Sequence, residues 1–276
     1  MDISQQAERS LDSEFRDSIR EPFLEAVRRY RLVRPGDRVA VCISGGKDSM
    51  LLAKLMQLSV QRGEIPAECV YLIMDPGYSP ANRERVEANA KLLGIPYQVF
   101  NSDIFQVANS QERNPCFLCA RMRRGFLYGR ARELGCSKIA LGHHFDDVIE
   151  TTVMALLYGA QLQAMPPRLS SKNFPGMELI RPLYLIREQD IMAWRDRHNL
   201  SFIQCACRFT EGREHGSVDS KRQEIKLLLR RLSETHPDVA RRVFEGICHL
   251  RADTLAGWKS RGEEHSFLEW YEPEAR

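Results

Sequence analysis

Six consecutive residues have the composition of a phosphate-binding loop. They follow an apolar run at residues 38–43, which predicts a buried strand, and they precede a segment of helical periodicity at residues 50–61. The six residues are Ser44-Gly45-Gly46-Lys47-Asp48-Ser49. Glycines at a helix start let backbone N–H groups converge on an anion, hydroxyls donate to phosphate oxygens, and a lysine neutralises charge. The string therefore predicts a nucleotide phosphate site, in which Asp48 is suited to hold Mg²⁺.

Further polar residues follow two other predicted strands. Asp75 ends the strand expected at residues 68–74, and Gly142 follows the strand expected at residues 138–141. In open α/β sheets, ligands bind beyond the carboxyl ends of the strands, and a glycine such as Gly142 lets a nucleotide approach closely. Asp146 and Asp147 stand at an expected helix start. There they can bind Mg²⁺ or polarise an attacking group, or they can simply cap the helix.

Two groups of cysteines suggest metal or redox chemistry. Cys116 and Cys119 lie at an expected helix start, where the helix terminus and nearby arginines favour thiolates. Cys205 and Cys207 follow much later in the chain. Three cysteines without an obvious fourth fit an iron–sulfur cluster with one open iron, whereas structural zinc usually has four protein ligands. By itself the Cys-x-x-Cys pair also fits a dithiol redox couple, half a zinc site or buried thiols.

Several of these motifs resemble those of a known family. The loop at residues 44–49 resembles the PP-loop of the ATP pyrophosphatase superfamily, and residues 141–147 resemble that superfamily's second signature. Residues 116–128 are similar to the Cys-x-x-Cys-x-Arg-x-Arg-Arg-Gly signature of the TtcA family, the tRNA 2-thiocytidine synthetases. Motifs at residues 158–159, 164–167 and 180–183 follow in the family's order. The resemblance covers roughly residues 20–231.

This resemblance implies an ATP- and Mg²⁺-dependent enzyme that adenylylates the C2 oxygen of a cytidine in tRNA and replaces it with sulfur. It implies that ATP binds to residues 44–49, Asp75 and Gly142, that Asp48, Asp147 and Arg123 are catalytic, and that Cys116, Cys119 and Cys205 hold a [4Fe-4S] cluster. The family's last cysteine site is Pro-Cys-x-x-Cys, whereas this chain has Gln204-Cys205-Ala206-Cys207, so Cys207 competes as the third ligand. The implied partners are tRNA, a sulfur donor (a cysteine desulfurase or sulfide) and a second copy of the chain in a homodimer.

Three other functions fit the same motifs. A superfamily ligase that delivers an amine would need no cluster. A sulfurtransferase could act on another nucleoside or on a small molecule. A non-catalytic module could bind nucleotide and use the cluster as a redox switch.

The elements that must position these residues alternate between strand and helix. Helices are expected at residues 81–93 and 119–134 and strands at residues 97–100 and 138–141, which predicts a doubly wound, mostly parallel α/β sheet of the PP-loop, adenine nucleotide alpha hydrolase-like type. We divide the chain into an N-terminal helical segment (1–33), a PP-loop domain with the iron–sulfur site (34–207), and a linker with basic C-terminal helices (208–276).

Composition narrows the setting. The 276 residues carry a formal net charge of +3, too mild to indicate nucleic-acid binding without local clusters. Two basic clusters can neutralise RNA phosphates, or they can simply form solvated helix faces. The first consists of Arg121, Arg123, Arg124, Arg130 and Arg132, and the second of Lys221, Arg222, Lys226, Arg230, Arg231, Arg241 and Arg242. We expect no membrane association, because no apolar run reaches about 18 residues. The first residues are polar, unlike a signal peptide, and without such a signal the cysteines are not expected to form disulfides. Both features predict a cytoplasmic protein.

Overall fold

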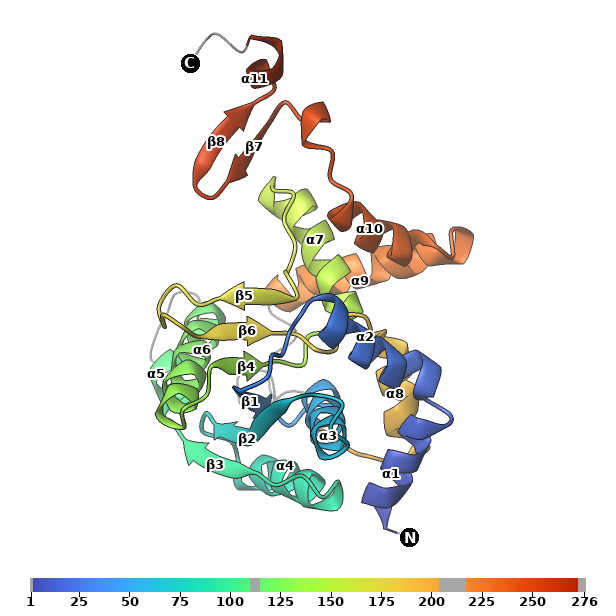
Figure 1. Cartoon of the computed structure of the whole chain (residues 1–276), viewed down its shortest axis with the longest axis vertical. Helices are drawn as coiled ribbons and strands as arrows, with labels where there is room; N and C mark the ends of the chain where they lie inside the picture. The colour runs from blue at the N-terminus through green and yellow to red at the C-terminus, as the bar shows by residue number, and fades with distance from the viewer. Residues whose placement is uncertain (1, 110–114, 204–216, 273–276) are drawn as a thin grey trace.

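The four predicted strands and two further ones form one six-stranded sheet in the computed structural model, which describes residues 2–109, 115–203 and 217–272 (Figure 1). The strand order is β3-β2-β1-β4-β6-β5. All neighbouring strands are parallel except β5, which pairs antiparallel with β6. The strands are β1 (Asp37–Ile43), β2 (Ala67–Asp75), β3 (Gln98–Asn101), β4 (Lys138–Ala140), β5 (Arg168–Ser170) and β6 (Glu178–Ile180). The predicted mostly parallel α/β fold is confirmed.

Helices connect the strands and cover the sheet. They are α1 (Ile3–Asp12), a π-helical turn (Arg16–Arg20), α2 (Glu21–Arg29), α3 (Lys47–Gln61), α4 (Pro80–Leu92), α5 (Ile104–Asn109), α6 (Pro115–Glu133), α7 (Phe145–Gly159), α8 (Glu188–Arg197), α9 (Ser217–Thr235) and α10 (Val239–Cys248). Beyond them lie a 3-10 turn (Ala252–Thr254), a hairpin of β7 (Gly257–Ser260) and β8 (Glu263–Ser266), and α11 (Leu268–Tyr271). In the part of the chain that the structure describes, no helix combines the length and apolarity needed to cross a membrane.

The two faces of β1 belong to two different cores. Val39 and Val41 pack into the cluster that contains α3, whereas Ala40 and Cys42 pack into the cluster beneath α6. Because successive side chains of a strand point to opposite faces, one continuous apolar run fills both cores. This arrangement explains why residues 38–43 show no alternation of polar and apolar residues.

The topology creates a crevice between β1 and β4. From β1 the chain winds outward through α3, β2, α4 and β3, then returns through α6 to place β4 on the other side of β1. Connections that leave a sheet in opposite directions open a crevice at the carboxyl ends of the strands. The loops after β1 and β4 flank this point, and they carry residues 44–46 and 141–144.

The N-terminal helices share the core of the sheet. Ala7 and Leu11 of α1 are fully buried in the same cluster as α3. The buried Lys54 of α3 donates to the Ser4 hydroxyl (2.9 Å) and to the carbonyl oxygen of Leu93 (2.9 Å). Residues 2–29 are therefore fastened to the sheet by both apolar packing and buried hydrogen bonds.

The C-terminal part packs mainly on α7. Phe145 of α7 stacks on Phe244 of α10, with ring centroids 4.5 Å apart, and Ile225 of α9 is buried in the same cluster. Figure 1 shows the β7–β8 hairpin beyond these helices, away from the main sheet. The elements not expected from the sequence include the edge strand β5, and the β7–β8 hairpin in the segment expected to hold a linker and helices. Both consist of short strands whose pairing depends on context rather than on a strong local pattern.

Candidate active site

The predicted phosphate loop forms the tight turn between β1 and α3. Gly45 has φ +86°, and a Cβ there would stand 2.4 Å from Val86 Cγ2 and 2.7 Å from Ile203 Cδ1. The Ser44 amide donates to Ser49 Oγ at 3.1 Å, and Ser49 Oγ donates to the Gly46 carbonyl oxygen at 2.9 Å. Only glycine fits position 45. The hydroxyl of Ser49 thus holds the turn from inside, while Gly46 caps α3 without a side-chain acceptor for the first amides, as an anion site requires.

Lys47 lies between two carboxylates. Its Nζ is 3.1 Å from Asp48 Oδ1 and 3.1 Å from Glu188 Oε1 of α8. Burial opposes the charged form of Lys47, but Asp48 and Glu188 outweigh it and raise the Lys47 pKa. Glu188 also pairs with Lys226 of α9. Although burial alone would raise the Glu188 pKa, hydrogen bonds from Lys226 and Lys47 lower it to about 2.

The loop after β4 packs against the start of α3. A Cβ on Gly142 would lie 3.0 Å from both Asp48 C and Ser49 N, so this glycine is required by the contact between the two loops. Asp147 and His144 form a capping box at the start of α7: Asp147 Oδ2 accepts from the His144 amide at 3.1 Å. Asp146 accepts from the Glu188 amide at 2.6 Å and pairs with Arg187. Asp147 therefore also stabilises the start of α7, and Asp146 also holds the start of α8.

His144 stands between the two acids that the sequence assigns to catalysis. Its Nε2 lies 3.7 Å from Asp48 Oδ1 and 3.5 Å from Asp147 Oδ2. Asp48 Oδ1 is buried and accepts no hydrogen bond from the part of the chain that the structure describes, although the Lys47 ammonium is near. A buried carboxylate oxygen without a donor is costly unless a cation or another donor reaches it. The chemistry of this oxygen fits a hard divalent cation.

Two basic side chains, one neutral and one charged, lie close to this centre. His143 Nδ1 has no hydrogen-bond partner among the described residues, and burial lowers the His143 pKa to about 4 against the opposing charge of Asp147, which keeps the ring neutral near pH 7. Arg181, just after β6, donates to the Pro166 carbonyl oxygen, but its Nε has no partner within the described ranges, and burial lowers the Arg181 pKa. Sequence reasoning did not single out either residue, because burial rather than a motif distinguishes them.

Helix α9 adds charges to the same edge. Arg222 lies 3.6 Å from Asp147 Oδ1 and 3.5 Å from the buried Glu150 Oε2. Burial raises the Glu150 pKa to about 7, although Lys226 and Arg222 lower it. The basic run in the sequence predicted charge on α9. The run did not indicate that Arg222 would contact acids of α7 or that Lys226 would contact Glu188 of α8.

Asp75 supports the phosphate loop through Tyr78. Its Oδ1 accepts from the amides of Gly77 (2.8 Å) and Tyr78 (2.7 Å), and its Oδ2 pairs with Arg83 at 3.1 Å. The Tyr78 hydroxyl in turn donates to the Ser44 carbonyl oxygen at 3.1 Å. These three contacts tie the Asp75 carboxylate to its own turn and to α4, next to the predicted nucleotide site.

Charges on α6 also act on Tyr78. Burial raises the Tyr78 pKa, Arg123 lowers it, and the charges of Asp75 and Cys119 raise it. Cys119 is half-buried and packs against both core clusters. The Cys116 side chain lies outside the described residues, as do Cys205 and Cys207. Within the described ranges, no group of three His, Cys, Asp or Glu residues could hold a metal ion.

Comparison with known proteins places this geometry in a wider group. Residues 11–207 match the family described as PP-loop domain. The chain is 37% identical over 237 residues to a tRNA-cytidine(32) 2-sulfurtransferase of Alkalilimnicola ehrlichii, covering 84% of this chain and 72% of that protein. It is 34% identical to the protein of the same name from Anaeromyxobacter sp. (strain K), covering 82% and 76%. Among solved structures, the U34-tRNA thiolase NcsA from Methanococcus maripaludis with its [4Fe-4S] cluster has a similar fold, with a TM-score of 0.61, 22% identity and coverage of 84% and 80%.

Proposed function

Because this chain belongs to the PP-loop family of tRNA-cytidine(32) 2-sulfurtransferases, we propose that it uses ATP to replace the C2 oxygen of a cytidine in tRNA with sulfur. One observation carries the proposal. A single edge of the sheet joins the phosphate loop and the Asp48–His144–Asp147 group, and Tyr78, whose hydroxyl donates to the loop, responds to the charge of Cys119 on α6. Phosphate binding and thiol chemistry at one place suit activation of an oxygen followed by delivery of sulfur.

The first step is adenylyl transfer. The C2 oxygen of cytidine attacks the α-phosphorus of ATP, the bond from this phosphorus to the bridging oxygen breaks, and pyrophosphate leaves. Residues 44–49 bind the leaving pyrophosphate, and Lys47 balances its charge when ATP displaces Glu188 from it. Asp48 and Asp147 would hold Mg²⁺, since Asp48 Oδ1 lacks a donor. Gly142 and the Asp75–Tyr78 turn shape the adenosine side of the site.

The second step replaces oxygen with sulfur. A hydrosulfide gives its electron pair to C2 and loses its proton, the C2–O bond breaks, and AMP leaves with the original oxygen. A [4Fe-4S] cluster held by Cys116, Cys119 and Cys205 would present sulfide to this carbon. Two observations support such a group. After burial, the charge of Cys119 is among the causes that raise the Tyr78 pKa, and Ile203, two residues before Cys205 in the sequence, packs against Gly45. Arg123, whose charge lowers the Tyr78 pKa against the effect of burial, would stabilise negative charge on the leaving AMP.

The same proposal includes the setting of the enzyme. We infer a cytoplasmic homodimer that receives sulfur from a cysteine desulfurase or from sulfide. Exposed leucines support self-association: Leu156 and Leu157 of α7 and Leu227 of the adjoining α9 are between 46% and 56% exposed. A surface of this kind is commonly an interaction site.

Thiolation of tRNA tests the proposed function directly. The anaerobically reconstituted protein should bind close to four iron atoms and convert cytidine in tRNA to 2-thiocytidine with release of AMP and pyrophosphate. Cys116→Ala and Cys205→Ala should lose iron and thiolation, whereas Cys207→Ala should keep both. Pyrophosphate release that survives in Cys116→Ala would favour a ligase of the same fold, which needs no cluster. ATP binding without pyrophosphate release on any RNA would favour a nucleotide-sensing module.

A further inference from the structure

Two glycines in the middle of α6 are not required by packing against the described residues. Gly125 and Gly129 have ordinary helical backbones, and a Cβ added to either would meet no heavy atom of the described residues within 4 Å. Glycine inside a helix is destabilising relative to alanine, because it loses more backbone freedom on folding. The fold itself therefore gives no reason for glycine at these positions, which points to something outside the chain that approaches the helix closely.

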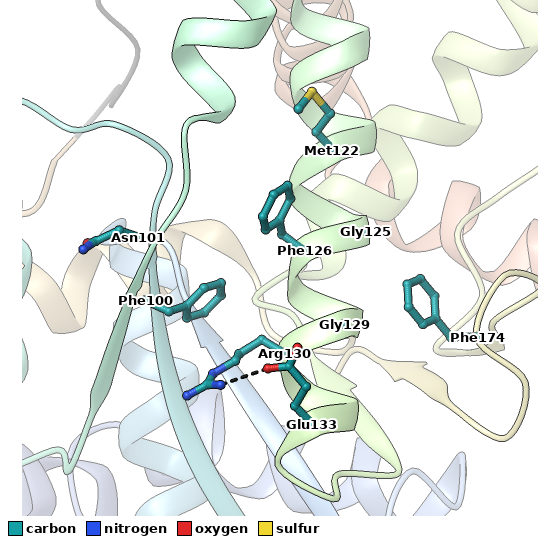
Figure 2. A pocket seen from close by; sticks show the side chains of 9 residues that line it. All are labelled: Phe100, Asn101, Met122, Gly125, Phe126, Gly129, Arg130, Glu133 and Phe174. Carbon is teal, nitrogen blue, oxygen red and sulfur yellow. Dashed lines mark hydrogen bonds and ion pairs between the residues drawn. The ribbon is translucent and has the colours of Figure 1, made fainter.

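These glycines form the floor of a surface hollow of about 650 Å³. Figure 2 shows Phe126 and Phe100 on one side of α6 and Phe174 on the other. Phe126 is 46% exposed, an unusual position for a large apolar ring. Phe174, by contrast, is held in place by stacking on Tyr128 at a centroid distance of 5.1 Å. The hollow thus combines an open floor with aromatic walls.

The arginines of α6 indicate that the hollow binds an anionic ligand. Helix α6 carries five arginines and one glutamate. Arg130, on the rim of the hollow, forms an exposed ion pair with Glu133 at 2.9 Å, which costs little to exchange for a phosphate (Figure 2). Aromatic rings flanked by arginines are the usual surface for an unpaired RNA base, whose flat face stacks while its phosphates meet the cations.

The position of the hollow relates it to the cysteine end of the helix. Phe126 follows Cys119 by seven residues, which is two helical turns, so the two side chains lie on the same face of α6 about 10 Å apart along its axis. An RNA strand whose reacting base lies near Cys119 would pass over Phe126 with a neighbouring nucleotide.

We propose that the hollow over Gly125 and Gly129 holds an unpaired base of the substrate RNA that is not the base being modified. This inference rests on the proposed tRNA thiolation. The bound base lies on the exposed helix backbone between Phe126 and Phe174, and Arg130 pairs with its phosphate. The hollow therefore selects and orients the RNA at a distance from the reacting carbon, so it acts on RNA affinity rather than on the chemical step.

Filling the floor tests the proposal. Gly129→Leu has room in the protein but occupies the hollow, and Phe126→Ala removes a wall. Both should raise the KM for tRNA about 5- to 150-fold, the range expected from loss of one base–aromatic stack, with little change in kcat or in the KM for ATP. Gly246→Leu is the matched control, because Gly246 is also a helical glycine with open space, in α10. It should leave all three parameters and the tRNA affinity unchanged.

The outcomes separate the two proposals. If the unaltered protein thiolates tRNA but Gly129→Leu keeps the original KM for tRNA, the hollow does not bind RNA and this inference is wrong. If Gly129→Leu slows only the transfer of sulfur from its donor, the occupant is the donor and the inference is equally overturned. Absence of thiolation by the unaltered protein would instead refute the proposed function. A 2-aminopurine placed at each unpaired position in turn should show one quenched site, and Phe126→Ala should abolish that quenching.

Discussion

The phosphate loop and helix α6 each contain two glycines, and Gly45 of the loop and Gly129 of the helix have opposite surroundings. At Gly45 a side chain would overlap Val86 and Ile203, whereas a Cβ at Gly129 would meet no described residue within 4 Å. The loop is closed by its own hydrogen bonds through Ser44 and Ser49. The α6 surface is open, with an exposed phenylalanine above it. The comparison teaches that the phosphate loop is organised by contacts within the chain, whereas the α6 surface has the open space that the proposed RNA base would fill.

A side chain at Gly45 should disturb the protein more than any other single change to these two regions. In Gly45→Ala, alanine would have to adopt the φ of +86° that glycine has here, and its Cβ would stand 2.4 Å from Val86 Cγ2. We expect a loss of about 2–5 kcal/mol in the free energy of unfolding, from overpacking and an unfavourable φ, together with loss of pyrophosphate release. Urea denaturation and a pyrophosphate assay measure both. A variant as stable as the parent protein would show that the loop yields to the added carbon, and the contrast with α6 would disappear.

A substitution at Asp48 should affect catalysis without affecting folding. Asp48→Asn keeps the shape of the side chain but removes the negative charge of the carboxylate, whose Oδ1 accepts no hydrogen bond from the described residues. We expect kcat for pyrophosphate release to fall about 100-fold, as for other preorganised electrostatic groups, with a melting temperature within a few degrees of the parent. Lys47 keeps its pair with Glu188 in this variant, which protects the fold. Restored activity at high Mg²⁺ would indicate that the carboxylate acts through the cation.

The same contrast explains what the sequence could predict. The turn at residues 44–49 and the buried strand before it are encoded in consecutive residues, so pattern and composition suffice. The pairing of Lys47 with Glu188, 141 positions later, depends on α8 and α9 folding onto the edge of the sheet. Likewise, Gly125 belongs to a family signature, but only the folded chain shows that a Cβ there meets open space. The β7–β8 hairpin escapes prediction because its strands are short and polar.

Glu150 and Glu188 provide a pH test of the charged edge. The Glu150 pKa is raised to about 7, so its carboxyl contributes most stability when protonated, at pH below about 4.5, and loses that contribution as pH rises through 7. We therefore expect Glu150→Gln to stabilise the protein by about 2 kcal/mol at pH 8 and to have little effect near pH 4.5. Denaturant unfolding across this range is the measurement.

Glu188→Gln is the matched control with the opposite sign. The Glu188 pKa is lowered to about 2, so its stabilising contribution exists above pH 4.5 and disappears as pH falls towards 2. This variant should destabilise the protein at pH 8. Equal pH profiles for the two variants would mean that their surroundings do not differ in charge.

Gly125→Ala should have the smallest effect and the most specific meaning. Alanine fits the open space and favours the helix, so the free energy of unfolding should increase by about 0.5–1 kcal/mol. A single methyl group raises the floor of the hollow only slightly, so the KM for tRNA should rise less than in Gly129→Leu. Thermal unfolding and steady-state thiolation, measured on one preparation, compare the two effects. Greater stability combined with weaker RNA use would mean that glycine at this position serves the partner rather than the fold. Greater stability with unchanged RNA use would leave the hollow without a ligand, and α6 would then differ from the phosphate loop only in packing.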